Sequence, residues 1–321
     1  MDIQREKSLV AAASVGSNSA LVLLKLVVGI IVGSVSVISE AIHSGMDLLA
    51  AIIALFAVKT SARHADEEHP FGHAKVENVS AFVEALLILL AAIWIIYEAI
   101  QKLINPQPLE AVGLGVAIML ISTVANIIVS RWLFKVGRKA DSPALIADGW
   151  HLRTDVYTSA GVMVGLGLIW TGGYVFPGVD LHWIDPVAAL AVAILILRTS
   201  YRLTIHAIRD LIDTSTPAEE TKWVRDYLTK MYPTMRSVHR LRTRKAGATR
   251  FIDVHIAVAS GMSVSESHHI AKQISQNITR HFTQADVIVH IEPCDGTCSD
   301  ACHSGCLLTE EEQKAVRSSE A

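Results

Sequence analysis

The sequence predicts an α-helical membrane protein with six transmembrane helices, followed by a small cytosolic α+β domain. Of its 321 residues, 51% are hydrophobic and only 18% are charged, whereas soluble domains usually carry about 25% charged residues. The mean hydropathy is positive, at +0.39. Long apolar stretches fill the first two thirds of the chain, and from about Ile212 the composition becomes that of a soluble domain. The net charge of −3 gives no reason to expect a nucleic-acid partner.

The apolar stretches define the predicted membrane spans. About 20 apolar residues in a helix cross a hydrocarbon core of about 30 Å. The sixth stretch is apolar only up to Leu197, but Arg198 and Arg202 can extend their charged ends to the membrane interface. The predicted spans are Ser8–Val32, Val35–Val58, Val79–Ile100, Ala111–Phe134, Leu145–Trp170 and a helix whose first residue is Pro186.

The distribution of Lys and Arg predicts the topology. These residues concentrate before the first span, after the second and fourth spans, and after the sixth. Because positively charged connections stay in the cytosol, both termini are expected there. No cleavable signal sequence is recognisable, so the first span is expected to remain in the mature protein. The predicted domains are a cytosolic N-terminus (1–7), a membrane domain (8–211), a cytosolic domain (212–293) and a Cys-containing tail (294–321).

Alternating and helical patterns predict the elements of the cytosolic domain. A helix is expected to begin near Thr216, with Pro217 in its first position. Two alternating segments form a predicted hairpin, and a helix and a short apolar strand follow it. The predicted ranges are 238–244 and 251–258 for the hairpin, 264–282 for the helix and 287–291 for the last strand.

Two predicted spans carry the same pair of metal-ligand residue types. His43 and Asp47 lie in the second span, and His151 and Asp155 lie in the fifth. A spacing of four places each pair on one helix face. Two imidazoles and two carboxylates suit a tetrahedral divalent ion such as Zn²⁺, and the two carboxylates neutralise its charge. Protons compete with the metal for these ligands. The alternative is that each pair makes a helix-packing hydrogen bond without metal.

Other polar residues of the membrane domain have two interpretations each. Asp148 lies three residues before His151, where a carboxylate that orients the imidazole is favoured over a fifth ligand. Asn18 interrupts the first span and is interpreted as a packing residue, the alternative being that it lines the metal path. In the first predicted cytosolic loop, the spacing of Asp66, His69 and His73 is compatible with weak zinc or iron binding or with a solvated, charged loop.

The cytosolic domain is rich in histidine. His239, His255 and His290 lie on or beside the predicted strands, and Glu292 shares a face with His290. His268 begins the second helix, with His269 beside it. These residues predict metal sites that clamp a dimer, although a scatter of surface histidines remains an alternative.

The tail contains all four cysteines within thirteen residues. Such a cluster is not a disulfide framework and indicates reduced thiols. Its spacing also differs from the paired CxxC of a zinc ribbon. A metal-buffering or delivery tail is favoured over disorder. The soft ligands of this segment are Cys294, Cys298, Cys302, His303 and Cys306.

Four segments, SEAIHSGMD, HPFGHAK, ADGWHLRTD and DVIVHIEPC, resemble the cation diffusion facilitator (CDF) family of zinc and iron efflux transporters. The resemblance extends from Ser8 to Cys294. It implies a homodimer with six spans and a metallochaperone-like cytosolic domain, in which metal leaves the cytosol in exchange for protons. It also implies three metal sites: a transport site of His43, Asp47, His151 and Asp155, a loop site of Asp66, His69 and His73, and a cytosolic site of His239, His255, His268, His290 and Glu292.

The chain departs from the family pattern at two of these positions. His43 stands where many bacterial members have aspartate, and imidazole in place of carboxylate favours Zn²⁺ over Mn²⁺ or Mg²⁺. Glu292 stands where an aspartate is usual. The resemblance further implies a charge lock between Lys75 and Asp213 that stabilises the dimer.

These observations predict a proton-coupled exporter of Zn²⁺ and not an enzyme. Cd²⁺, Co²⁺ and Fe²⁺ can share the same ligands. The protein is expected to span the inner membrane several times and to work by alternating access around the intramembrane site. The alternative is a membrane-anchored metal sensor or scaffold. A third interpretation, an intramembrane metallohydrolase, needs an open coordination position, which four protein ligands do not leave.

Overall fold

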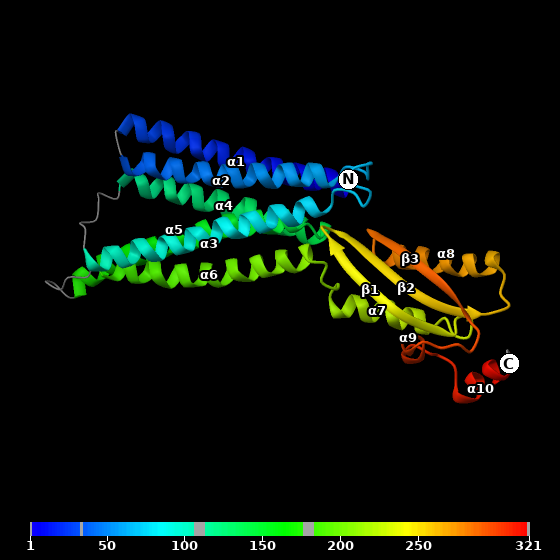
Figure 1. Cartoon of the computed structure of the whole chain (residues 1–321). Coiled ribbons are helices and arrows are strands. Elements are labelled where there is room, and N and C mark those ends of the chain that lie inside the picture. Colours follow the sequence, from blue (N-terminus) through cyan, green and yellow to red (C-terminus); the bar gives the residue numbers. More distant parts are fainter. Residues whose placement is uncertain (1, 33–34, 106–112, 176–182, 320–321) are drawn as a thin grey trace. The chain divides into compact units, whose positions relative to one another are not determined.

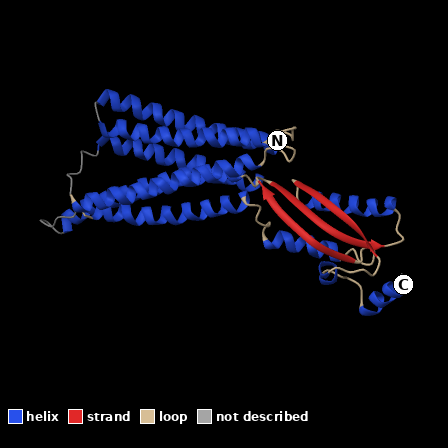
Figure 2. Cartoon of the chain, viewed as in Figure 1, coloured by secondary structure: helices blue, strands red, loops and turns tan. Residues whose placement is uncertain are grey.

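The computed structural model describes residues 2–32, 35–105, 113–175 and 183–319. The chain divides into two compact units, Met1–Leu211 and Ile212–Ala321. Each unit is described by itself (Figures 1 and 2).

The described part of the first unit consists of long helices (Figure 1). Five of them are apolar and long enough to cross a membrane, namely α1, α2, α3, α4 and α6. The remaining long helix, α5, carries the predicted ligands His151 and Asp155. The bounds are α1 Ile3–Val32, α2 Val35–Ser61, α3 Lys75–Ile104, α4 Gly113–Ala140, α5 Pro143–Val175 and α6 Ile184–Leu211.

The helices extend beyond the predicted apolar stretches, because polar or charged residues continue most of them past the apolar part, as Lys59 does in α2 and Lys75 and Glu77 do in α3. The prediction that Pro186 begins the sixth helix is wrong, since α6 begins at Ile184. Pro186 lies in the first turn, where a missing N–H removes no helical hydrogen bond. Residues 111 and 112 of the predicted fourth span lie outside the described residues.

A buried carboxylate joins four of these helices. Glu77 in α3 is 2% exposed and accepts hydrogen bonds from Lys7 Nζ in α1 and Ser142 Oγ beside α5. Ser61 Oγ at the end of α2 donates to the same carboxylate at 2.6 Å. A buried charge is tolerated when it is paired and hydrogen-bonded in this way. Glu77 therefore fixes neighbouring helix ends at the Lys7 end of the unit.

The second unit is an α+β fold, as predicted. A three-stranded sheet in the order β1-β2-β3 has β1 antiparallel and β3 parallel to the central β2. The elements are α7 Ala218–Thr229, β1 Ser237–Ala246, β2 Thr249–Ala259, α8 Val264–His281 and β3 Ala285–Cys294. Pro217 is the N-cap of α7 rather than its first residue, a small correction of the prediction.

Alternation along the strands separates the two faces of this sheet. Val254 and Ile256 of β2 are fully buried and pack in a core with α7 and α8. Because successive side chains point to opposite faces, His255 lies on the face away from this core. After β3 the tail forms two short helices, α9 Asp300–Ser304 and α10 Glu310–Ser319.

Candidate metal sites

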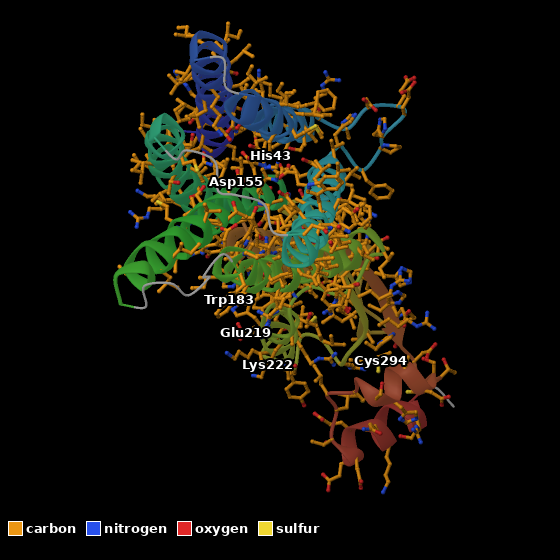
Figure 3. The ribbon with its side chains drawn as sticks, turned by 90° about the vertical axis from the view of Figure 1, so that its left-hand side faces the viewer. His43, Asp155, Trp183, Glu219, Lys222 and Cys294 are labelled. Carbon is orange, nitrogen blue, oxygen red and sulfur yellow. The ribbon has the colours of Figure 1, made fainter. Side chains whose placement is uncertain are left out.

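The first candidate site arises from the opposite directions of α2 and α5 (Figure 1). Each helix carries histidine followed by aspartate one turn later. In antiparallel helices the aspartate of one helix lies level with the histidine of the other. The structure accordingly brings Asp47 against His151, and it brings His43 toward Asp155 (Figure 3).

The geometry of this site suits a metal ion. His43, Asp47 and Asp155 each offer a ligand atom, and these atoms lie within 4.8 Å of one another. His151 Nε2 lies 3.1 Å from Asp47 Oδ1 and so joins the group through that carboxylate. Asp47 and His151 are 7% and 8% exposed, whereas His43 is exposed. Two carboxylates and the imidazole of His43 are therefore close enough to share one divalent ion, and His151 lies in hydrogen-bond contact with one of these carboxylates.

Polar residues from two other helices, α1 and α4, lie around the ligands. Lys25 of α1, itself 4% exposed, donates to Ser44 Oγ at 2.7 Å. Asn126 of α4 donates to Asp155 Oδ2 at 3.5 Å. Both line the same pocket as the three ligands, and so does Asn18. The place of Asn18 in this pocket agrees with the alternative interpretation that it lines the metal path. Lys25 and Asn126 were given no role from the sequence, although the rarity of polar residues in a membrane span is itself a signal of function.

The predicted role of Asp148 remains a prediction. Its side chain is fully buried, and neither carboxylate oxygen has a hydrogen-bond partner among the described residues. His151 Nδ1 is likewise buried without a partner in that part of the chain.

A second cluster lies in the loop between α2 and α3. Asp66 Oδ1 is 3.3 Å from His69 Nδ1, and Asp66 Oδ2 is 3.3 Å from His73 Nε2. The His69 backbone N–H donates to Asp66 and is the main cause that lowers the pKa of this carboxyl. Gly72 has φ +80°, a value that favours glycine, and it turns the chain toward His73. The three side chains can hold one ion.

A third cluster lies on the open face of the sheet. His239, His255 and His290 are paired across neighbouring strands. Glu292 lies 3.0 Å from His239 Nε2 and 2.7 Å from His255 Nδ1, and its distance to His290 Nε2 is 3.8 Å. Hydrogen bonding from His255 is the largest cause that lowers the pKa of Glu292. His239, His255 and Glu292 can bind one metal ion.

The predicted ligand His268 does not belong to the group of side chains gathered around Glu292. His268 is exposed on α8, in a shallow pocket beside His269. Asp213 interacts with Arg244 at 3.5 Å within the second unit, and Lys75 begins α3 in the first. The charge lock between Lys75 and Asp213 stays a prediction.

The tail cysteines gather at the end of β3. Cys294, Cys298, Cys302 and Cys306 are free thiols that line one pocket. His303 is exposed and interacts with Arg317 at 3.4 Å, so it lies outside this set.

Known proteins match almost the whole chain. The cation efflux transmembrane domain matches residues 11–212, and the cation efflux protein cytoplasmic domain matches residues 216–294. The cation-efflux pump FieF of Klebsiella pneumoniae is 36% identical over 289 residues, which is 89% of this chain and 92% of that protein. FieF of Citrobacter koseri is 34% identical over 287 residues, 89% and 93% of the two chains.

A solved structure also matches part of the chain. The metal-bound C-terminal domain of the CzcD transporter from Thermotoga maritima is 26% identical, with a TM-score of 0.23, and covers 24% of this chain and 94% of that one. The two family matches and the FieF relatives cover both units of the chain. The chain is a membrane-embedded cation efflux transporter and belongs to the cation diffusion facilitator family.

Proposed function

We propose that the chain exports Zn²⁺ from the cytosol in exchange for protons, with His43, Asp47, His151 and Asp155 as the transport site. The observation that carries this proposal is the convergence of these ligands from two antiparallel helices inside the helical unit. Two carboxylates balance the charge of a divalent ion, which lowers the cost of holding it within the bilayer. The histidines favour Zn²⁺ over Mn²⁺ and Mg²⁺.

The contact between Asp47 and His151 provides the coupling. An imidazole nitrogen 3.1 Å from a carboxylate oxygen needs a proton between them to form a hydrogen bond. A metal ion that takes Nε2 as a ligand must displace that proton, which leaves the site when the ring also carries a proton on Nδ1. Zinc and protons therefore compete for the same atoms, and each can drive the other out of the site.

We place the protein in the inner membrane as a homodimer with both termini in the cytosol. Lys and Arg are concentrated in the segments assigned to the cytosol, and the cytoplasmic-domain family is named for its dimer. Metal at His239, His255 and Glu292 would regulate transport from that domain.

Reconstituted vesicles test this function. Zinc uptake is driven by an imposed pH gradient and followed with a metal-sensitive dye, for the parent chain and for Asp47→Ala and Asp155→Ala. Both variants should lose most of the uptake, because each removes a charged ligand. Asp226→Ala is the matched control, since this exposed aspartate of α7 pairs only with a lysine on its own helix among the contacts described. Uptake by both ligand variants at the parental rate would refute the transport site.

The second candidate, a metal sensor or scaffold, is favoured only by the cluster of His239, His255 and Glu292 on the sheet. Uptake that persists in His255→Ala but disappears in Asp155→Ala would assign turnover to the membrane site. Metal binding without any uptake by the parent chain would instead support the sensor.

A further inference from the structure

Four thiols converge at the start of the tail: Cys294 is the last residue of the second family match, and Cys298, Cys302 and Cys306 lie beyond it. Cys294 ends β3 (Figure 3), Cys302 lies in α9, and Cys298 and Cys306 lie on either side of that helix. The spacing of four between successive cysteines would follow one side of a straight helix. Here the chain instead turns at Gly296 (φ +83°) and Gly305, and all four residues line a single pocket.

The thiols influence one another, as expected for a compact group. Burial raises the pKa of the Cys294 thiol, and the nearby Cys302 and Cys306 raise it further. Burial also raises the pKa of Cys298, with Cys302 as the next cause.

Two arginines line the same pocket. Arg236 hydrogen-bonds to the Cys294 sulfur, and Arg317 acts electrostatically on Cys298. Four thiolates around a divalent cation carry a net charge of −2, and two guanidinium groups offset that charge. Hydrogen bonds from positively charged donors to the sulfurs of a metal site also orient the ligands.

The tail is built onto the edge of the sheet. Val238 N–H donates to Gly305 O at 2.9 Å, and Leu307 N–H donates to Arg236 O at 2.9 Å. Residues of the tail thus extend the sheet beyond its edge strand β1, with Cys306 opposite Ser237. This pairing covers backbone groups that an exposed edge strand would leave free.

Gly305 makes this close approach possible. A Cβ atom at this position would lie 1.9 Å from Val238 O and 3.2 Å from the His239 side chain. A backbone oxygen cannot move away as a flexible side chain can, so any larger residue would lift the tail from β1.

We propose that Cys294, Cys298, Cys302 and Cys306 form a four-thiolate site for a soft divalent cation such as Zn²⁺, which fastens the tail to the edge of β1. Four cysteine ligands at tetrahedral geometry are the usual set of a structural zinc site. Binding energy at such a site becomes folding energy for the short segment that carries it.

The site also contacts the third metal cluster through one side chain. Ser237 Oγ lies 3.1 Å from Cys302 O, to which it donates, and 3.2 Å from His239 Nδ1. His239 in turn contacts Glu292. Metal bound by the tail would therefore hold Ser237 in place, and the Ser237 hydroxyl contacts Nδ1 of His239, a predicted ligand of the cytosolic site.

Cobalt titration of the full-length, reduced and metal-stripped protein tests the site. Only the tail contains cysteine, so a sulfur-to-cobalt charge-transfer band reports this site and not the histidine–carboxylate clusters. The band should saturate at one Co²⁺ per chain and be displaced by Zn²⁺. Cys302→Ser should weaken or abolish it. X-ray absorption of the zinc form should show sulfur ligands at about 2.3 Å.

Gly305→Ala tests the docking while it retains all four thiols. Its affinity for Co²⁺ should fall by about 10- to 100-fold, the range seen when supporting contacts of a metal site are lost. Gly261→Ala is the matched control, because a Cβ atom added at this turn of the same unit would have no heavy atom within 4 Å. In the parent, zinc should slow hydrogen exchange of the Leu307 amide.

Three results would overturn the proposal. They are a reduced parent chain without the charge-transfer band, a band unchanged in Cys302→Ser, and disulfides among these cysteines in protein purified without oxygen. Equal affinity of Gly305→Ala and the parent would refute the docking. The Cys302→Ser variant should still transport zinc in vesicles, so failure of this proposal is distinguishable from failure of the transport site.

Discussion

Replacement of Asp47 by asparagine separates the charge of the transport site from its shape. Asparagine keeps an oxygen that can accept the hydrogen bond from His151 Nε2, now at 3.1 Å from Asp47 Oδ1. It removes one of the two negative charges that balance the ion. The variant should therefore fold, yet bind zinc weakly.

The size of the effect follows from the lost charge. A hydrogen bond to a charged group contributes about 1.5–3 kcal/mol in a folded protein. We take the same range for the interaction of the Asp47 carboxylate with the ion. At about 1.4 kcal/mol per factor of ten, zinc affinity should fall roughly tenfold to hundredfold. The buried ammonium of Lys25 in the same pocket opposes the ion further once Asp47 is neutral.

The assay is the zinc concentration dependence of uptake into vesicles, together with thermal unfolding in detergent. Asp47→Asn should raise the half-saturating zinc concentration with little loss of thermal stability. Asp47→Ala should lose both zinc affinity and thermal stability, because it also leaves the buried imidazole of His151 without its partner, at a cost of about 1–3 kcal/mol. Asp226→Asn on α7 is the control. A half-saturating concentration within twofold of the parent for Asp47→Asn would refute the charge argument.

Three further predictions concern the other sites. His43→Asp should broaden metal competition toward Cd²⁺ and Mn²⁺, since it replaces imidazole by carboxylate; unchanged competition in uptake assays would refute the selectivity argument. Metal-stripped Glu292→Gln should melt at a lower temperature than the metal-stripped parent at neutral pH, and this difference should disappear on acidification. The reason is that the pKa of Glu292 is lowered in the folded state. The stability that its charge contributes is therefore present above the ordinary pKa of glutamate and is lost as the pH falls through the lowered value. A gap that is independent of pH would contradict this. Truncation after Pro293 should lower the metal bound per chain, measured by elemental analysis, but leave transport intact; loss of all transport would give the tail a larger role.

The sequence predicted the helical elements because their signals are local. Apolar length marks each span, and the alternation around Val254 marks the strand. The pairs His43/Asp47 and His151/Asp155 were recognisable for the same reason, since a spacing of four places both side chains on one helix face.

Contacts between distant segments were not predictable in this way. Lys25 and Asn126 line the same pocket as His43, Asp47 and Asp155 because α1 packs against α2 and α4 against α5, and no local pattern specifies that packing. The Glu77 cluster gathers side chains from positions 7, 61 and 142. The tail has no long periodic pattern, and its order comes from backbone pairing with β1 and from the glycine that permits it.

The antiparallel pairing of α2 and α5 gives the proposed transport site an approximate twofold symmetry. A half-turn about an axis between the two helices exchanges His43 with His151 and Asp47 with Asp155. An ion that enters from either side of the membrane then meets the same donors in the same order. Such a site has no inherent direction, so in the proposed exporter the direction of net transport would be set by the gradients of zinc and protons across the membrane.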